Sequence, residues 1–337
     1  MFGKLMNNFY YGKSGKGDFT RDDLPKNRWQ LFFAMLRVRF SALCRLNLMT
    51  VVCWLPLIIL IGYCLTSFFN ALVLENEYLL YLETGAPGEL TSAQIQDFST
   101  LEAPEAFALE AGLQLLSTFC LWAIPSILFT GPAQAGMAFV TRNWAMDEHA
   151  FIWSDFIDAV KANWKQALGI SAITSVVPLV VFVGYQFYGQ QAENSVLFLA
   201  PQMLIVSLGL VWALALTYLY PLLVTYELTF SQLIKNALLM AIGRLPQTAG
   251  VRLITLVPTV LCVAAFFFTG SLFPWMFLAG YYLLIGNALA RFIFASVANA
   301  AFDRYINPLL DGQPLNRGMA PQEEDDDAPD DPGDDPV

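Results

Sequence analysis

Six long runs of apolar residues constrain the fold of this chain more than any other feature. Each run is close to the roughly 20 residues that an α-helix needs to cross a bilayer. Of the 337 residues, 56% are hydrophobic and only 14% are charged, whereas about a quarter of the residues of soluble domains are charged. A soluble fold could not bury so much apolar surface. The predicted spans are residues 48–72, 111–129, 167–188, 196–223, 251–268 and 273–295.

We therefore expect an all-α fold, a polytopic membrane helix bundle of about six transmembrane helices preceded by an amphipathic interfacial helix. The second span can continue as a helix through Gly131-Pro132 to Val140. The predicted parts are a flexible basic cytoplasmic arm (1–23), the amphipathic helix (24–46), a six-span membrane domain (47–311) and a disordered acidic cytoplasmic tail (312–337).

The amphipathic helix is predicted from apolar residues that recur every three or four positions, with arginines on the other faces. The apolar set is Trp29, Phe32, Phe33, Leu36, Phe40 and Leu43, and the arginines are Arg28, Arg37, Arg39 and Arg45. Because arginine suits lipid head groups, we expect this helix to lie in the membrane interface. Packing against the bundle is the alternative.

Lysine and arginine predict the orientation, since basic residues accumulate in cytoplasmic loops. Nine of the 18 precede the first span, and the others lie between spans two and three, between spans four and five, or near and after the end of span six. The loop 73–110 has eight acidic residues and no basic one, so we expect it outside the cell. The loops 142–166 and 226–250 are then cytoplasmic, as are both termini of a multi-pass protein in the bacterial cytoplasmic (plasma) membrane.

Little in the sequence indicates catalysis. No nucleophile–base set stands out, and the five cysteines lie in or beside apolar segments without metal-ligand spacing. His149 follows Asp147 and Glu148, but three adjacent loop residues rarely converge on one metal ion, so a solvated loop is the simpler interpretation. We expect no enzyme activity, no cofactor or metal, and no nucleic-acid partner.

Ionisable residues are nearly absent from the predicted spans. Arg252 is expected at a cytoplasmic edge, and Arg291 about one turn from the end of span six, where it can extend to the interface. The intramembrane polar candidates are Gln202 and Asn287, which could line a small polar path, although amides more often join helices.

The loop between spans two and three is dense in charged and aromatic residues and holds the only histidine. We interpret it as the first candidate surface for a protein partner. The candidate contact residues are Arg142, Asp147, Glu148, His149, Asp155, Phe156, Lys161, Asn163 and Trp164.

The same stretch resembles a known family in several blocks. The shared pattern is a GP-x-x-A segment, an arginine, an acidic-His stretch and a DF…K-x-N-x-K-Q run, which here are Gly131, Pro132, Ala135, Arg142, Asp147 to His149, Asp155-Phe156 and Lys161 to Gln166. The segment YPLLVTYELTFSQLIKNALLMAI from Tyr220 is similar to a second block. On these blocks the chain resembles the YesL-like family of bacterial integral membrane proteins.

This resemblance implies a role but no catalytic residues, because the family has none established. Its members resemble companions of ABC-type carbohydrate importers. We therefore expect a non-enzymatic accessory protein of ABC-type carbohydrate uptake or its regulation, with permease or ATPase subunits as candidate partners. The alternatives are an independent small-solute transporter, with Gln202 and Asn287 along its path, and a membrane sensor or scaffold.

Overall fold

The computed structural model describes residues 24–101, 103–310, 312 and 314–320. The predicted arm, residues 1–23, and residues 321–337 of the predicted tail lie outside the described residues. Within the described chain every regular element is helical, and six helical stretches are long and apolar enough to cross a membrane. Apart from Phe129 at the end of the second, the predicted spans fall within these stretches, so the all-α membrane bundle is confirmed.

The helices follow one another with short connections. In chain order, the α-helices are α2 (Arg28–Val51), α3 (Leu55–Thr84), α4 (Ser92–Ser99), α5 (Phe107–Leu128), α6 (Thr130–Ala145), α7 (Ser154–Ala192), α8 (Leu199–Leu223), α9 (Phe230–Gly243), α10 (Leu245–Thr269), α11 (Phe273–Tyr281) and α12 (Asn287–Tyr305). Short 3₁₀ turns are η2 (Val52–Trp54), η3 (Pro104–Ala106), η4 (Val196–Phe198) and η6 (Asn307–Leu309), and η5 (Tyr282–Gly286) is a π-helix.

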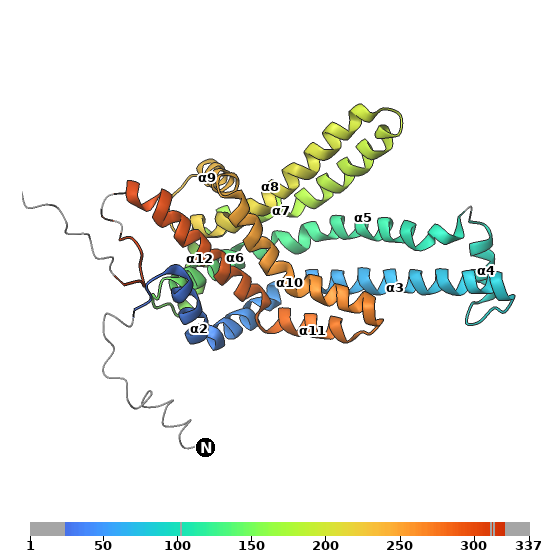
Figure 1. Cartoon of the computed structure of the whole chain (residues 1–337), viewed down its shortest axis with the longest axis horizontal. Coiled ribbons are helices and arrows are strands. Elements are labelled where there is room, and N and C mark those ends of the chain that lie inside the picture. The colour runs from blue at the N-terminus through green and yellow to red at the C-terminus, as the bar shows by residue number, and fades with distance from the viewer. Residues whose placement is uncertain (1–23, 102, 311, 313, 321–337) are drawn as a thin grey trace, which may run out of the picture.

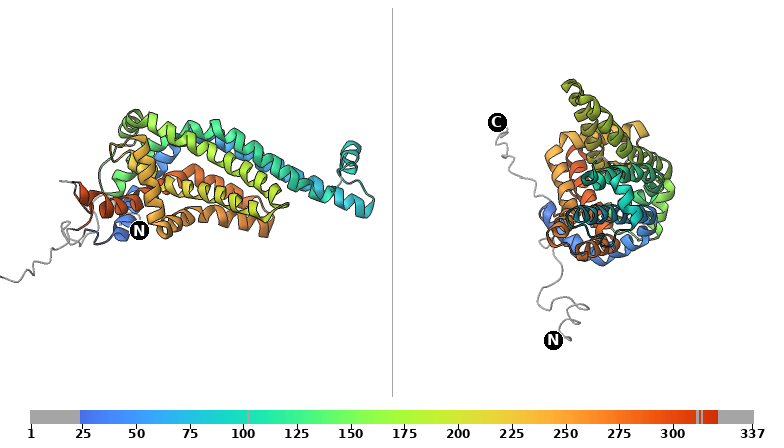
Figure 2. Two further views of the ribbon diagram at one scale, coloured as in Figure 1. Left: turned by 90° about the horizontal axis from the view of Figure 1, so that it is seen from above. Right: turned by 90° about the vertical axis from the view of Figure 1, so that its right-hand side faces the viewer.

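Helical hairpins project from a common base. The α3–α5 and α7–α8 hairpins diverge from each other, and α10 and α11 form a further pair (Figure 1). The α3–α5 hairpin reaches well beyond the others, and α4 lies at its tip (Figure 2). The base contains α2, α6, α9 and α12, so elements far apart in the sequence meet there.

Helix α6 lies at the centre of the base and is almost entirely buried. It packs against α7 and α12, and small residues allow the close approach. A Cβ on Gly131 would overlap the backbone of Ala167, and one on Gly136 would overlap Phe156 and Val160. The tight packing of α6 on α7 therefore depends on glycine at these positions.

Pro132 explains why α5 and α6 are separate helices. Proline has no N–H to donate to the carbonyl four residues earlier, which is that of Leu128, the last residue of α5. The Ser171 hydroxyl of α7 donates to this carbonyl instead, at 2.6 Å. The predicted continuation of span two is thus helical, with a break at Phe129. Ser171 of α7 hydrogen-bonds to the Leu128 carbonyl left unpaired by the break.

Helix α2 packs on the base along one face. Leu31, Leu43 and Leu46 are buried in a core that also contains Trp144 and Phe292. Its other face exposes aromatic residues predicted for the apolar side, namely Trp29, Phe33 and Phe40. The helix predicted for residues 24–46 therefore packs against the bundle, which was the alternative to the interfacial position. Its aromatic face stays exposed.

Asn47 of α2 completes the irregular part of the sixth span. Its amide nitrogen donates to the carbonyls of Tyr282 and Leu283, both at 2.8 Å, and its amide oxygen accepts from the Ala288 N–H at 2.9 Å. These groups belong to the π-helix and its junction with α12. The side chain is 1% exposed, so α2 supplies polar partners that the irregular helix cannot supply itself.

The predicted loop 73–110 is mostly helical hairpin. Helix α3 continues to Thr84, and α5 begins at Phe107. Between them α4 starts with a capping box formed by Thr91 and Gln94. Phe98 stacks on Tyr78 with ring centroids 4.7 Å apart, which gives the tip a small core of its own.

Candidate functional site

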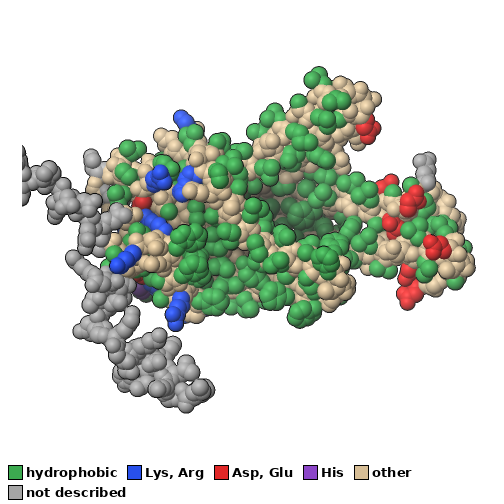
Figure 3. Space-filling view, viewed as in Figure 1, with side chains coloured by type: hydrophobic (Ala, Val, Ile, Leu, Met, Phe, Trp, Pro, Cys, Tyr) green, Lys and Arg blue, Asp and Glu red, His purple; other side chains and the backbone are tan. Residues whose placement is uncertain are grey.

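Charge is separated between the two ends of the molecule. On the face shown in Figure 3, lysine and arginine lie over the base, whereas acidic side chains gather at the far tips of the hairpins. We call the base the basic end and the tip around α4 the acidic end. Hydrophobic side chains cover the hairpins between the two and line a hollow between the diverging hairpins (Figure 3). This is the distribution expected of a chain that crosses a bilayer between two aqueous regions.

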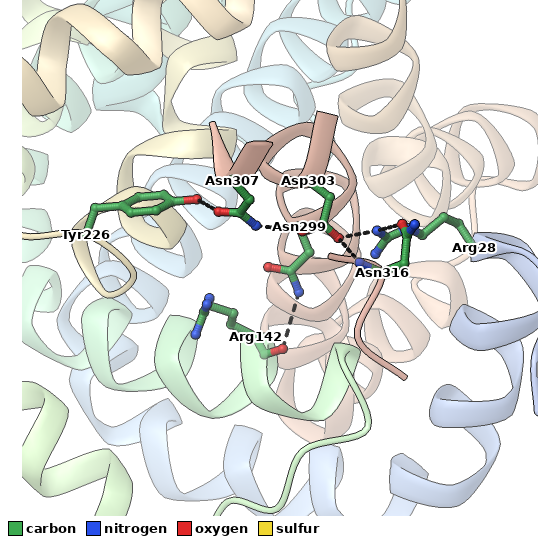
Figure 4. Close-up of polar contacts among 7 residues, drawn as sticks. All are labelled: Arg28, Arg142, Tyr226, Asn299, Asp303, Asn307 and Asn316. Atoms are coloured by element: carbon green, nitrogen blue, oxygen red, sulfur yellow. Dashed lines mark hydrogen bonds and ion pairs between the residues drawn. The ribbon is translucent and has the colours of Figure 1, made fainter. Parts of the chain in front are cut away.

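A network of polar side chains joins several elements at the basic end (Figure 4). Asp303 near the end of α12 forms an ion pair with Arg28 of α2 and accepts a hydrogen bond from the Asn307 amide at 2.6 Å. Asn307 accepts in turn from the Tyr226 hydroxyl, also at 2.6 Å. Arg28 also donates to the Asn316 side chain at 2.8 Å. We call these five residues the polar clasp.

Residues 314–320 pack against the base, whereas the sequence predicts a disordered tail from residue 312. Arg317 forms an ion pair with Glu148 at 2.6 Å, and the Ala320 N–H donates to the Pro25 carbonyl at 3.0 Å. Gly318 has a φ of +77°, and a Cβ there would overlap the Met146 backbone. Within the described residues, the predicted tail therefore begins with a packed segment that contacts the start of the chain.

Arg142 lies at the end of α6, beside the clasp. The Asn299 amide of α12 donates to its backbone carbonyl at 3.3 Å (Figure 4). Burial lowers the pKa of its guanidinium below the usual value, an effect that the nearby Glu148 carboxylate opposes. Its Nε is buried without a hydrogen-bond partner. Arg142 is therefore a half-buried packing residue rather than a free surface group.

The turn between α6 and α7 holds the acidic-His stretch. Asp147 is exposed with a φ of +58°, and the ring of His149 lies edge-on to that of Phe151 with centroids 4.5 Å apart. The Asp155 carboxylate accepts from the Phe151 N–H at 2.8 Å and so holds the turn in place. No group of three or more His, Cys, Asp or Glu side chains in the described chain could hold a metal ion.

A groove opens at the basic end between α7 and the α8–α9 connection. It has a volume of about 940 Å³ and is lined by residues 161–166 and 223–229. Lys161 and Trp164 are exposed there, and the Lys165 ammonium lies 5.7 Å from the centre of the Trp164 ring. The Gln166 amide donates to the Leu228 carbonyl at 3.0 Å and joins the two walls. We call this cavity the basic-end groove.

Tyr226 connects the basic-end groove to the polar clasp. It lines the groove, and its hydroxyl donates to Asn307 of the clasp. Burial raises its pKa to about 12; the positive charge of Arg142 opposes this rise, and the negative charge of Asp303 adds to it. The phenol therefore stays protonated near neutral pH and keeps donating to Asn307.

The predicted contact residues thus fall into separate groups. Lys161, Asn163 and Trp164 line the basic-end groove. Arg142 and Glu148 lie near the clasp and the segment 314–320. Phe156 is only 8% exposed, because it fills the space beside Gly136 on α6, so it is a core residue.

The two intramembrane candidates lie in different parts of the fold. The Gln202 amide is buried and donates to the Tyr185 carbonyl at 3.1 Å, within the α7–α8 hairpin. Asn287 begins α12, next to the π-helix that α2 contacts. Gln202 lies within the α7–α8 hairpin and Asn287 at the start of α12, and no hydrogen bond among the described residues connects the two side chains.

Two arginines that the sequence predicts at the membrane edges lie instead inside the bundle. Arg291 was expected to extend to the interface, but its guanidinium stacks on Tyr220 of α8 and donates to Gln134 of α6. Arg252 was expected at an edge, but it donates to Thr217 of α8 at 2.9 Å and lies over the Phe294 ring. The signal was present, since arginine within an apolar segment is a functional pointer.

Comparison with known proteins assigns the chain to a family without a known activity. Residues 111–185, which make up most of α5, all of α6 and most of α7, match the family described as "Protein of unknown function, DUF624". The uncharacterized protein YesV of Bacillus subtilis (strain 168) is 31% identical over 159 residues, which cover 47% of this chain and 73% of that protein. The chain belongs to this family of unknown function. No solved structure matches it.

The DUF624 match coincides with the structural centre of the molecule. It contains the α5–α6 break, the buried α6 and the residues of α7 that line one wall of the basic-end groove. The matched region therefore carries the helix packing around Gly131 and all nine predicted partner-contact residues, three of which line the basic-end groove.

Proposed function

We propose that this protein is a non-enzymatic accessory protein of membrane transport that binds its partner through the basic-end groove. The observation that carries the proposal is the groove itself, an open cavity of about 940 Å³ with an exposed tryptophan and two lysines on one wall. Tryptophan is among the residues most often found at the centre of protein interfaces. Two lysines favour a partner segment with acidic side chains.

The resemblance to the YesL-like family supports the choice of partner. We infer that the partner is a cytoplasm-facing segment of an ABC-type carbohydrate importer, in its permease or its ATPase subunit. The protein would then lie in the bacterial cytoplasmic membrane with both termini in the cytoplasm. The concentration of basic residues at the end that carries the groove supports this orientation.

The test is co-purification from native membranes in a mild detergent, with bound proteins quantified by mass spectrometry. We compare the wild type with the double variant Lys161→Ala, Trp164→Ala, which removes groove side chains that are exposed and make no core contact. The matched control is Trp153→Ala, Lys235→Ala, which removes an exposed tryptophan and an exposed lysine that do not line the groove.

The wild type and the control should retain an importer subunit in near-stoichiometric amount. The amount of importer subunit that co-purifies with the groove variant should be at least tenfold lower, because central interface residues typically contribute about 2 kcal/mol or more to binding. A correctly folded groove variant that retains the partner would overturn the groove assignment. A wild type that purifies alone would overturn the accessory role, and solute flux into vesicles containing only this protein would then test the transporter alternative.

A further inference from the structure

Arg252 and Arg291 bring two positive charges together inside the spanning part of the molecule. Both lie beside one ring: the guanidinium carbon of Arg252 is 4.4 Å and that of Arg291 is 5.9 Å from the centre of Phe294. Arg252 belongs to α10, and Arg291 and Phe294 belong to α12. We call the two residues the arginine pair.

The hydrogen-bond donors of the arginine pair are only partly satisfied. Thr217 accepts from Nε of Arg252, and Gln134 accepts from Nη2 of Arg291. Nη2 of Arg252 and Nη1 of Arg291 are buried and have no acceptor in the described chain. The aromatic contacts occupy guanidinium faces and leave these in-plane N–H groups without a partner.

No carboxylate compensates the charge, since neither arginine forms an ion pair with any acidic residue among those described. Arginine stays protonated in proteins, so it cannot escape the cost of burial by losing its proton. Two like charges beside one ring, each with an unpaired buried donor, are costly in an apolar environment. An anion bound by both guanidinium groups would offset the like charges and accept hydrogen bonds from the unpaired N–H groups. The planar edge of a guanidinium is suited to two oxygens of one anion.

We infer that the arginine pair binds a phosphate oxyanion. The site lies where α6, α8, α10 and α12 meet, and Arg252 is two turns into α10, which is about 10 Å from its first residue at a rise of 1.5 Å per residue. This depth is close to the boundary between lipid head groups and hydrocarbon. The neighbouring Leu253 and Ile254 are 66% and 57% exposed, so the lipid-facing surface of α10 adjoins the site. The phosphate of a membrane lipid and a free phosphate ion share the required chemistry.

The test uses the full-length protein purified in an uncharged detergent. One arm measures retained phospholipid by native mass spectrometry after reconstitution in nanodiscs of phosphatidylglycerol, with phosphatidylcholine as the zwitterionic comparison. The other arm measures the thermal unfolding midpoint against inorganic phosphate, with sodium chloride at equal ionic strength as its control. The variants are Arg252→Gln and Arg291→Gln, and Arg304→Gln is the matched control, an exposed arginine near the end of α12.

The lipid source predicts about one retained phosphatidylglycerol per wild-type chain, with retention at least tenfold lower in Arg252→Gln and Arg291→Gln and unchanged in Arg304→Gln. The free-ion source predicts no retained lipid and a phosphate-dependent rise of the midpoint that both variants lose. The wild-type measurements stand even if a variant fails to fold. A wild type that retains no lipid and does not respond to phosphate would overturn the inference, as would full binding by both variants.

Discussion

At the scale of single residues, Asn47 is the clearest example of a side chain whose role is set by its surroundings. An asparagine near the start of an apolar span would ordinarily be interpreted as an interface residue. In the fold its amide satisfies two carbonyls and one N–H of the irregular sixth span. Inside a membrane protein no water replaces such partners.

We therefore predict that Asn47→Ala lowers the free energy of unfolding by about 3 kcal/mol, because buried backbone groups lose their partners at a cost of about 1–3 kcal/mol each. The measurement is thermal or denaturant unfolding in detergent. Asn70→Ala is the control, since Asn70 is exposed on α3 and makes no side-chain hydrogen bond in the described chain. Equal stability of the two variants would contradict the role of Asn47.

The residue scale is also where sequence reasoning is least complete. Trp164 and Lys161 are exposed beside a groove, whereas Phe156 from the same stretch is a core residue. Hydropathy along the chain does not encode which face of a helix meets a neighbour. The depth of Arg291 is set by its stacking on Tyr220, which is 71 positions away in the chain, so no local pattern indicates it.

At the scale of elements, the tip of the α3–α5 hairpin forms a small unit of its own. The Phe98 ring of α4 stacks on Tyr78 and meets Phe107 at a tilt, with ring centroids 4.7 Å apart in each pair. The sequence predicts an acidic external loop in residues 73–110 but does not indicate a core. In the fold, Tyr78, Leu90 and Phe98 of this stretch form a separate buried cluster.

We predict that Phe98→Ala loosens this tip without weakening the base. Removing a buried aromatic ring costs about 3 kcal/mol, which should raise amide hydrogen exchange in residues 85–106 at least tenfold. The unfolding midpoint of the whole protein should change little, because the cluster lies at the far end of the hairpin (Figure 2). Leu82→Ala, which removes an exposed side chain of α3 near the same tip, should leave exchange unchanged. Exchange that rises equally in α6 would show that the tip and the base unfold together.

Element boundaries differ from the sequence expectation for identifiable reasons. The boundary between the amphipathic helix and the first span was expected near residue 47, but α2 continues to Val51 and η2 precedes α3. Buried leucines of α2 hold this helix on the base. The second span was expected to continue as a helix through Gly131-Pro132, and the structure divides it into α5 and α6. That α7 repairs the break through Ser171 is a contact between distant segments, which only the folded chain reveals.

At the scale of the whole molecule, the number of spans follows directly from the lengths of the apolar runs. The separation of charge also follows from the sequence. Basic residues lie before the first span, in the loops between spans two and three and spans four and five, and near and after the end of span six, all at one end of the spans. The acidic residues 73–110 connect spans one and two at the opposite end. What the chain alone does not predict is the divergence of the hairpins above a compact base (Figure 1). That shape depends on which helices share small residues, such as Gly131 and Gly136 between α6 and α7.

We propose that the basic end, with its groove, faces the cytoplasm and that the acidic end faces outward. Cysteine labelling in intact bacterial cells tests it most directly, in a variant whose five free cysteines have been replaced. Glu89→Cys marks the acidic end and Asp158→Cys marks α7 beside the groove, and both positions are exposed. A membrane-impermeant maleimide should label Glu89→Cys in intact cells and Asp158→Cys only after permeabilisation. Labelling of Asp158→Cys in intact cells would place the groove outside and contradict the account.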